Sequence, residues 1–162
     1  MSKHQGFPFP PAAGAAAGLS QLLTPKGKKA KRIRRVAAVA LVAASGGVAL
    51  ATVGAFARRG TTLDPTAPSN ASTLVTSGTN GISRNPIYVG IAGILAAHAI
   101  DRGSWQAWLP VGGFVIAMDR FQIAKEEQAL RSLFGEEFLQ YCERTPRWLD
   151  RRSLGFIKGN QE

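Results

Sequence analysis

Two groups of polar residues lie beside apolar segments and are placed to do chemistry. The first is Ser83–Gly90, in which a cation, a helix-starting proline and an aromatic residue open one apolar segment. The second is the pair Glu126 and Glu127, which follows the next apolar segment. Polar groups at the mouth of a membrane-embedded bundle are costly to keep there, so they indicate a site. Carboxylates, an arginine and a tyrosine suit the binding of a polar ligand.

Three uncharged segments must position these groups. Residues 36–57 form an Ala- and Val-rich run that is about 33 Å long as a helix, enough for a hydrocarbon core of about 30 Å. Residues 86–100 and 103–118 are shorter, and only Asp101 and Arg102 separate them. We expect these two to form a tight transmembrane hairpin. The predicted fold is an all-α, polytopic membrane helical bundle.

The net charge of +10 is concentrated beside the first apolar segment. Residues 1–35 contain eight Lys or Arg residues and no Asp or Glu, whereas residues 119–162 are balanced. A juxtamembrane basic cluster is typical of a topology determinant or an anionic-lipid contact. Nucleic-acid binding calls for basic residues interleaved with aromatic ones on a folded face, and residues 26–35 lack that pattern. We therefore expect membrane lipids as partners, and no nucleic acid.

The N-terminal region, residues 1–35, is rich in Ala, Gly and Pro and then basic. Residues 10–24 are weakly apolar, and they form either an extra helix or a flexible tail. Arg34-Arg35, an apolar run and Ala55-Phe56-Ala57 resemble a cleaved export signal. The run is longer than such signals have, and two more apolar segments follow it, so we favour a retained membrane segment. Residues 36–162 then form the functional domain.

The tail, residues 119–162, begins with an amphipathic pattern that predicts a helix, which Gly135 either breaks or bends. Adjacent helical residues point about 100° apart, so Glu126 and Glu127 cannot both face water equally when one side of the helix packs on the bundle. At least one carboxylate must then face the interior, where it needs a cationic or hydroxyl partner.

Metal chemistry finds little support in the composition. Cys142 is the single cysteine, which excludes a disulfide framework within the chain and a thiolate metal cluster. His98 stands alone in an apolar run, where a packed or hydrogen-bonded role is the commoner one. We expect no metal site.

The chain resembles the isoprenylcysteine carboxyl methyltransferase/phospholipid methyltransferase family of small integral membrane enzymes. The similar motifs keep their order and spacing over roughly residues 58–149, and they are Gly60-Thr61-Thr62, Asp64-Pro65, Leu74–Gly78, Ser83–Gly90, Glu126–Leu130, Phe134–Phe138, Tyr141 and Arg144–Leu149. No single motif is decisive, but the ordered combination is specific.

The resemblance implies an enzyme that uses S-adenosylmethionine, with the cofactor entering from the cytosolic side. It places the cofactor-binding residues at Arg84, Asn85, Tyr88, Gly90, Glu126 and Glu127. Asn85 stands where many members carry histidine, and an asparagine forms hydrogen bonds but cannot carry a proton. This difference favours a binding role at that position. Residues 79–82 also depart from the family pattern, which leaves the substrate contacts of that loop open, and no catalytic residue is assigned.

Methyl transfer from a sulfonium is an in-line displacement that needs alignment and exclusion of water more than a strong base. A carboxylate of the acidic pair can hold ribose hydroxyls or face the sulfonium charge, and Arg84 can hold a carboxylate bidentately. Arg144 and Arg147 are candidates for binding an anionic acceptor, with snorkelling toward lipid headgroups as the equal alternative. The acceptor is an isoprenylcysteine carboxylate, a lipid amine or another hydrophobic molecule.

Localisation follows from the apolar segments and the cofactor. We expect an integral membrane protein, of a bacterial inner membrane, with its cofactor site facing the cytosol. That orientation puts the basic cluster on the opposite side, against the positive-inside tendency. The rival hypothesis is a non-catalytic membrane protein whose basic N-terminal region binds anionic lipid or a partner protein.

Overall fold

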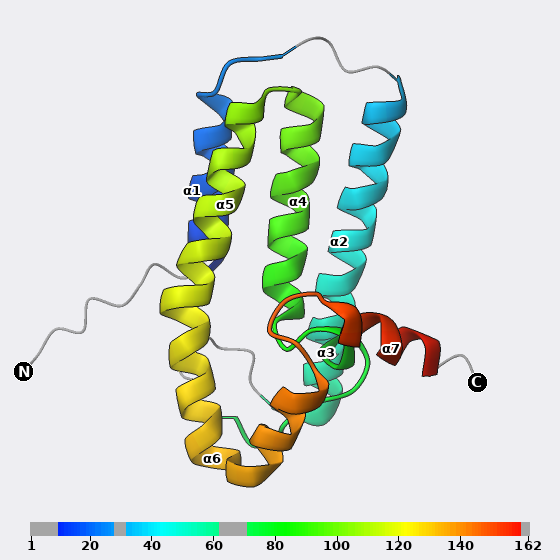
Figure 1. Cartoon of the computed structure of the whole chain (residues 1–162), viewed down its shortest axis with the longest axis vertical. Coiled ribbons are helices and arrows are strands. Elements are labelled where there is room, and N and C mark those ends of the chain that lie inside the picture. Colours follow the sequence, from blue (N-terminus) through cyan, green and yellow to red (C-terminus); the bar gives the residue numbers. More distant parts are fainter. Residues whose placement is uncertain (1–9, 28–31, 62–70, 160–162) are drawn as a thin grey trace, which may run out of the picture.

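The computed structural model describes residues 10–27, 32–61 and 71–159, and every regular element in these ranges is a helix. The all-α prediction is therefore confirmed for this part of the chain. The predicted motif Asp64-Pro65 and the basic residues Lys28, Lys29 and Lys31 lie outside the described residues. Figure 1 shows α4 between α2 on one side and the pair α1 and α5 on the other.

The long helices start and stop where the local chemistry predicts. Helix α2 spans Arg32–Arg59, and α4 spans Pro86–Arg102 with its proline in the first turn, where a missing N–H is tolerated. Gly103 ends α4 in the left-handed conformation at φ 69°, and its N–H donates to the carbonyl of Ala99. The segments predicted at 36–57 and 86–100 are thus helical with slightly wider bounds.

The third apolar segment differs from its predicted form. It begins with a short 3-10 helix, η2, at Trp105–Trp108, and continues as α5, Leu109–Ala117. A π-helical turn, η3, at Met118–Gln122 joins α5 to α6, Ile123–Arg144. No helix-breaking residue separates α5 from α6, so the helix runs without interruption into the tail. Figure 1 shows this run lying antiparallel to α4.

Gly135 bends α6 near its C-terminal end. Its φ of 48° and ψ of −119° are accessible essentially only to glycine. The chain turns back there, so that Phe138 and Tyr141 are buried against Leu74 in a small core. The predicted bend is confirmed. A short helix α3, Thr79–Ile82, and a C-terminal helix α7, Arg151–Gly159, pack on each other at the same end of the molecule.

Helix α1, Pro10–Leu22, answers the open question about residues 10–24, because it packs on α4 and α5. Gln21 is fully buried, and its amide donates to the carbonyls of Leu95 and Ala107, both at 2.9 Å. Its oxygen lies 2.8 Å from Nδ1 of His98. A carboxamide oxygen only accepts, so His98 donates from Nδ1. His98 therefore has the hydrogen-bonded role that we expected.

Helices α2 and α4 pack closely through small residues. A Cβ on Gly93 would lie 2.1 Å from Oγ of Ser45, and one on Gly90 would lie 3.0 Å from the Ser45 carbonyl oxygen. The opposite side of α2 exposes apolar side chains, including Leu50 at 75%. Of the described helices, α2 alone is long and apolar enough to cross a membrane by itself. The spanning roles of residues 86–100 and 103–118 stay predictions.

Candidate active site

A cavity of about 410 Å³ lies where the ends of α1, α2, α4 and α6 meet the loop before α4. This volume is in the range of pockets that bind small molecules. Most of its lining is apolar, and the polar side chains come from α4, α6 and the segment around α3. The lining residues are Pro10, Pro11, Thr52, Val53, Phe56, Ala71, Thr73, Leu74, Val75, Asn80, Arg84, Asn85, Pro86, Ile87, Tyr88, Glu126, Glu127, Leu130, Phe138 and Tyr141.

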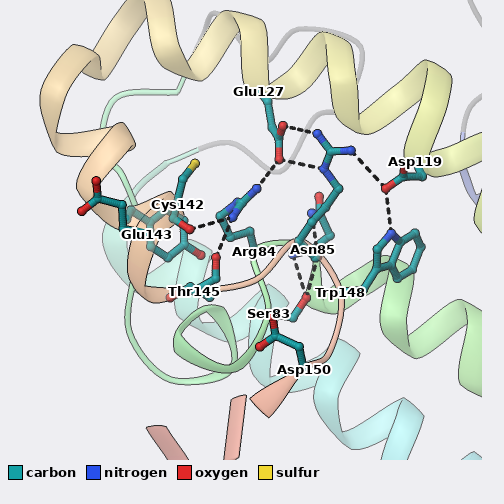
Figure 2. Close-up of polar contacts among 12 residues, drawn as sticks. Ser83, Arg84, Asn85, Asp119, Glu127, Cys142, Glu143, Thr145, Trp148 and Asp150 are labelled. Atoms are coloured by element: carbon teal, nitrogen blue, oxygen red, sulfur yellow. Dashed lines mark hydrogen bonds and ion pairs between the residues drawn. The ribbon is translucent and has the colours of Figure 1, made fainter. Parts of the chain in front are cut away.

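The two sequence-predicted groups meet in this cavity through Glu127. The Glu127 carboxylate accepts from Nη2 of Arg84 at 2.6 Å, and from Nε and Nη2 of Arg147 at 3.0 and 2.5 Å. Figure 2 shows Arg84 below the Glu127 carboxylate, with Cys142 and Thr145 to the left of its guanidinium. Arg84 also donates to the backbone carbonyls of these two residues, at 3.2 and 2.6 Å. Glu127 is thus the centre of an ion-pair network.

Glu126 has a different set of partners. Its Oε1 accepts from the hydroxyl of Tyr88 at 2.5 Å and from the amide of Gln122 at 2.8 Å. Within the described ranges, Glu126 makes no ion pair, whereas its neighbour makes two. The angle between consecutive helical residues produces this division, because it directs one carboxylate to the arginines and the other to Tyr88.

These surroundings move the pKa values of the two carboxyl groups in opposite directions. Burial raises the pKa of Glu126, and the charge of Glu127 adds to that, against weaker opposing hydrogen bonds from Tyr88 and Gln122. Burial also acts to raise the pKa of Glu127. There, hydrogen bonds and positive charge from Arg147 and Arg84 together outweigh burial, and the pKa is lowered. The site thus contains one carboxylate, Glu127, whose charge is balanced by two arginines, and a second, Glu126, that has no ion-pair partner among the described residues.

Asp119 extends the network and was not among the sequence-predicted residues. Its Oδ1 accepts from Nη1 of Arg147 at 3.1 Å and from Nε1 of Trp148 at 3.0 Å, as Figure 2 shows for Trp148. It stands in the π-helical turn η3, and such turns are frequent at functional sites. Its position at the end of an apolar run was the available sequence signal. Its partner could not be deduced, because Arg147 is 28 residues away.

The turn before α4 is fastened to the segment after α6. The Ser83 hydroxyl and the Asn85 amide both donate to the carbonyl of Arg147 at 3.0 Å, and the Arg84 N–H donates to that of Pro146 at 2.9 Å. Asn85 therefore binds a backbone carbonyl here, and this role does not require a side chain that carries a proton. Figure 2 shows Ser83, Arg84 and Asn85 grouped on this turn.

Three predicted site residues do not line the cavity: Gly90, Arg144 and Arg147, the last of which is linked to it through its ion pair with Glu127. Gly90 faces Ser45 of α2, where its missing Cβ permits close helix packing. Arg144 is exposed, and its Nε donates to the carbonyl of Gln140 in the preceding helical turn at 3.3 Å. The structure thus brings together Arg84, Asn85, Tyr88, Glu126, Glu127 and, through its ion pairs, Arg147.

Two buried polar atoms at the cavity lack a partner among the described residues. They are Oδ1 of Asn80 and Nε of Arg84, an acceptor and a donor, and both residues line the cavity. The hydroxyl of Tyr141 is already used, because it donates to the Asn80 carbonyl at 2.6 Å. Unpaired buried polar atoms are unfavourable, so they suit a ligand with its own donors and acceptors. In the described part of the chain, no three His, Cys, Asp or Glu side chains come together as metal ligands.

Comparison with known proteins identifies the family of the chain. Residues 33–137, more than half of the chain, match the Phospholipid methyltransferase family. The chain belongs to this family. The resemblance inferred from the sequence is thereby confirmed, and membership indicates a membrane-associated methyltransferase.

One relative and the solved structures complete the comparison. An uncharacterized protein of Haemophilus influenzae (strain ATCC 51907 / DSM 11121 / KW20 / Rd) is 40% identical over 63 residues, which are 39% of this chain and all of that protein. No solved structure matches the chain significantly.

Proposed function

We propose that the protein transfers a methyl group from S-adenosylmethionine to a hydrophobic, membrane-associated acceptor. The observation that carries the proposal is the polar wall inside an otherwise apolar cavity, in a member of a phospholipid methyltransferase family. Apolar walls exclude water, and the polar wall orients the reactants. Those are the two requirements of an in-line methyl transfer.

The residues present fit this cofactor. Its adenosine and methionyl parts carry both donors and acceptors, which the unpaired atoms of Asn80 and Arg84 can satisfy. Glu126 supplies a carboxylate without a cationic partner among the described residues, a suitable group to face a positive ligand. Bound there, S-adenosylmethionine would supply an electrophilic methyl group on a sulfonium. We assign cofactor binding to Arg84, Asn85, Tyr88, Glu126 and Glu127, and packing of α4 to Gly90.

An amine is the better acceptor for this cavity than a carboxylate. Arg147 was predicted to hold an anionic acceptor, but it is ion-paired with Glu127 and Asp119. An acceptor carboxylate would have to displace one of them and would also face the charge of Glu126. An ammonium group is attracted by the same carboxylate. It must lose a proton before its nitrogen can bond to the methyl carbon, and Glu126 is placed to accept that proton.

The proposed arrangement in the membrane follows the same residues. We infer that α4 and the run from η2 to η3 form the predicted transmembrane hairpin beside α2, which returns the chain to the side it left. The cavity is then in the headgroup region of the cytosolic leaflet, where the cofactor is available. A lipid acceptor can reach it from the bilayer.

Calorimetric titration of the detergent-purified protein with S-adenosylhomocysteine tests the proposal. We expect binding by the wild type, loss of binding by Glu127→Ala, and unchanged binding by the control Glu137→Ala, which alters an exposed residue of the same helix. Absence of binding by folded wild-type protein would overturn the enzyme hypothesis. It would leave the non-catalytic alternative. Incubation with labelled cofactor and separate amine-bearing and carboxylate-bearing lipids then identifies the acceptor class.

A further inference from the structure

A second cleft lies at the opposite end of α4 from the active-site cavity. It is formed where the start of α2 meets the turn after α4, and Arg34, Ala99, Ile100, Gly103, Ser104, Trp105 and Trp108 line it. None of these residues lines the active-site cavity. The cleft therefore needs an explanation of its own.

Arg34 is built into this cleft by the turn itself. Its guanidinium donates to the carbonyl of Ile100 from Nε and Nη2, at 3.2 and 2.8 Å, and to that of Asp101 at 3.2 Å. A Cβ on Gly103 would lie 2.0 Å from Nη2 of Arg34, so only glycine leaves room for the cation. Gly27, which lies in the basic segment (residues 26–35), also contacts this turn, because its N–H donates to the Arg102 carbonyl at 3.0 Å.

Ser104 supplies an unused hydroxyl. Its Oγ is buried and has no hydrogen-bond partner among the described residues, although it lines the cleft beside Arg34. A buried hydroxyl without a partner costs free energy that a ligand oxygen can recover. A cation and a hydroxyl donor at one place suit an oxyanion.

The rim of the cleft is apolar and aromatic. Trp105 is 70% exposed and Trp108 is 46% exposed, and Leu109, the next residue in the chain, is 62% exposed. Tryptophan favours the headgroup level of a bilayer. The sequence around Arg34, residues 26–35, contains seven Lys or Arg residues and no acidic one. The nearby Asp101 carboxylate lies 3.9 Å from Nε of Arg35, which offsets its negative charge.

We propose that this cleft binds the phosphate group of an anionic phospholipid, with Arg34 and Ser104 contacting the phosphate oxygens and Trp105 and Trp108 lying along the lipid. Free phosphate would satisfy the first two residues equally well. The exposed tryptophans and the adjoining exposed apolar surface of α2 favour the lipid as the source. The proposal is independent of the activity of the other cavity.

Quenching of tryptophan fluorescence by brominated lipid tests this site in the full-length protein in mixed micelles. The probes are brominated phosphatidylglycerol, brominated phosphatidylcholine and inorganic phosphate as a competitor. We expect half-maximal quenching at an at least tenfold lower fraction of phosphatidylglycerol than of phosphatidylcholine. Ser104→Ala should raise the fraction of phosphatidylglycerol needed for half-maximal quenching about tenfold or more, the effect of losing one hydrogen bond to a charged group.

Two variants that remove the same charge distinguish binding in the cleft from a general attraction of lipid to basic residues. Arg34→Gln should abolish the preference, whereas Arg32→Gln, which removes the same charge from an exposed side chain two residues away, should retain it. Equal losses in the two variants would overturn the proposal. So would an unchanged half-maximal fraction of phosphatidylglycerol in Ser104→Ala, which keeps the result decisive if Arg34→Gln does not fold. Competition by millimolar inorganic phosphate would also overturn it, in favour of a free-phosphate site.

Discussion

At the scale of single residues, the two adjacent carboxylates have different tasks. Glu127 is held by Arg84 and Arg147, and its charge is compensated within the protein. Glu126 is buried beside Tyr88, and its pKa is raised. The negative charge that is available to a ligand therefore resides on Glu126, and a ligand can sense whether that group is ionised.

This difference predicts a pH dependence that distinguishes two ligands. The raised pKa means that Glu126 loses its proton at a pH above the ordinary glutamate value of about 4.3. Affinity for the cationic S-adenosylmethionine should rise as the pH increases above that value, while the affinity for S-adenosylhomocysteine, which lacks the sulfonium, changes much less. Titration calorimetry at several pH values measures both. In Glu126→Gln the two profiles should become parallel; a persistent difference would assign the effect to another group.

The sequence predicted which residues lie together better than it predicted their partners. Residue types and family motifs placed Arg84, Tyr88, Glu126 and Glu127 together, and they share one cavity. The pairing of Arg147 with Glu127 and Asp119 depends on how the chain returns after Gly135, which no local pattern specifies. The same return takes Arg144 to the surface, although it is three residues from Arg147.

At the scale of elements, local turn signals predicted the ends of α4, but no local signal predicted the junction between α5 and α6. Pro86 and Gly103 are local signals, and both mark the ends of α4. The π-helical turn η3 has no comparable signal, because it inserts a residue into a helix whose side-chain pattern continues on both sides. Helix α7 was not predicted either, because its nine residues are too few for a clear period.

The bend of α6 at Gly135 can be tested by substitution. Its backbone conformation is unfavourable for any residue with a Cβ, so Gly135→Ala should destabilise the protein by about 1–3 kcal/mol. The bend also carries Phe138 and Tyr141 to the cavity, so S-adenosylhomocysteine binding should weaken as well. Thermal unfolding in detergent and calorimetry measure the two effects. The control is Gly112→Ala in α5, where an added Cβ meets no atom within 4 Å; equal effects in the two variants would contradict the argument.

At the scale of the whole molecule, the two clefts lie at opposite ends of one bundle. Helix α2 has 28 residues and is about 42 Å long, enough to hold its two ends on opposite sides of a hydrocarbon core of about 30 Å. Helix α1 has 13 residues, about 20 Å, so it cannot make a full crossing as a straight helix. The active-site cavity adjoins the C-terminal end of α2, and the basic segment adjoins its N-terminal end.

The basic segment and the proposed cofactor therefore predict opposite orientations of the bundle in the membrane. The positive-inside tendency would put the basic segment in the cytosol, whereas S-adenosylmethionine is available only to a cavity that faces the cytosol. We expect the cofactor to decide. The proposed methyl transfer requires the cofactor, whereas anionic headgroups at the other end can compensate the basic segment. Attraction to an anionic surface is worth about 1 kcal/mol for each Lys or Arg residue near it, so bound anionic lipid can stabilise the basic segment on that side.

Cysteine labelling in intact cells distinguishes the two orientations. Asp101→Cys and Glu137→Cys, each in a Cys142→Ser background, place one exposed thiol at the basic end and one beside the active-site end. A membrane-impermeant maleimide should label Asp101→Cys in intact cells, and Glu137→Cys only after the membrane is permeabilised. The reverse result would place the cavity outside the cytosol and remove the cofactor from reach. Labelling of both thiols in intact cells would instead show that the bundle does not hold its two ends on opposite sides.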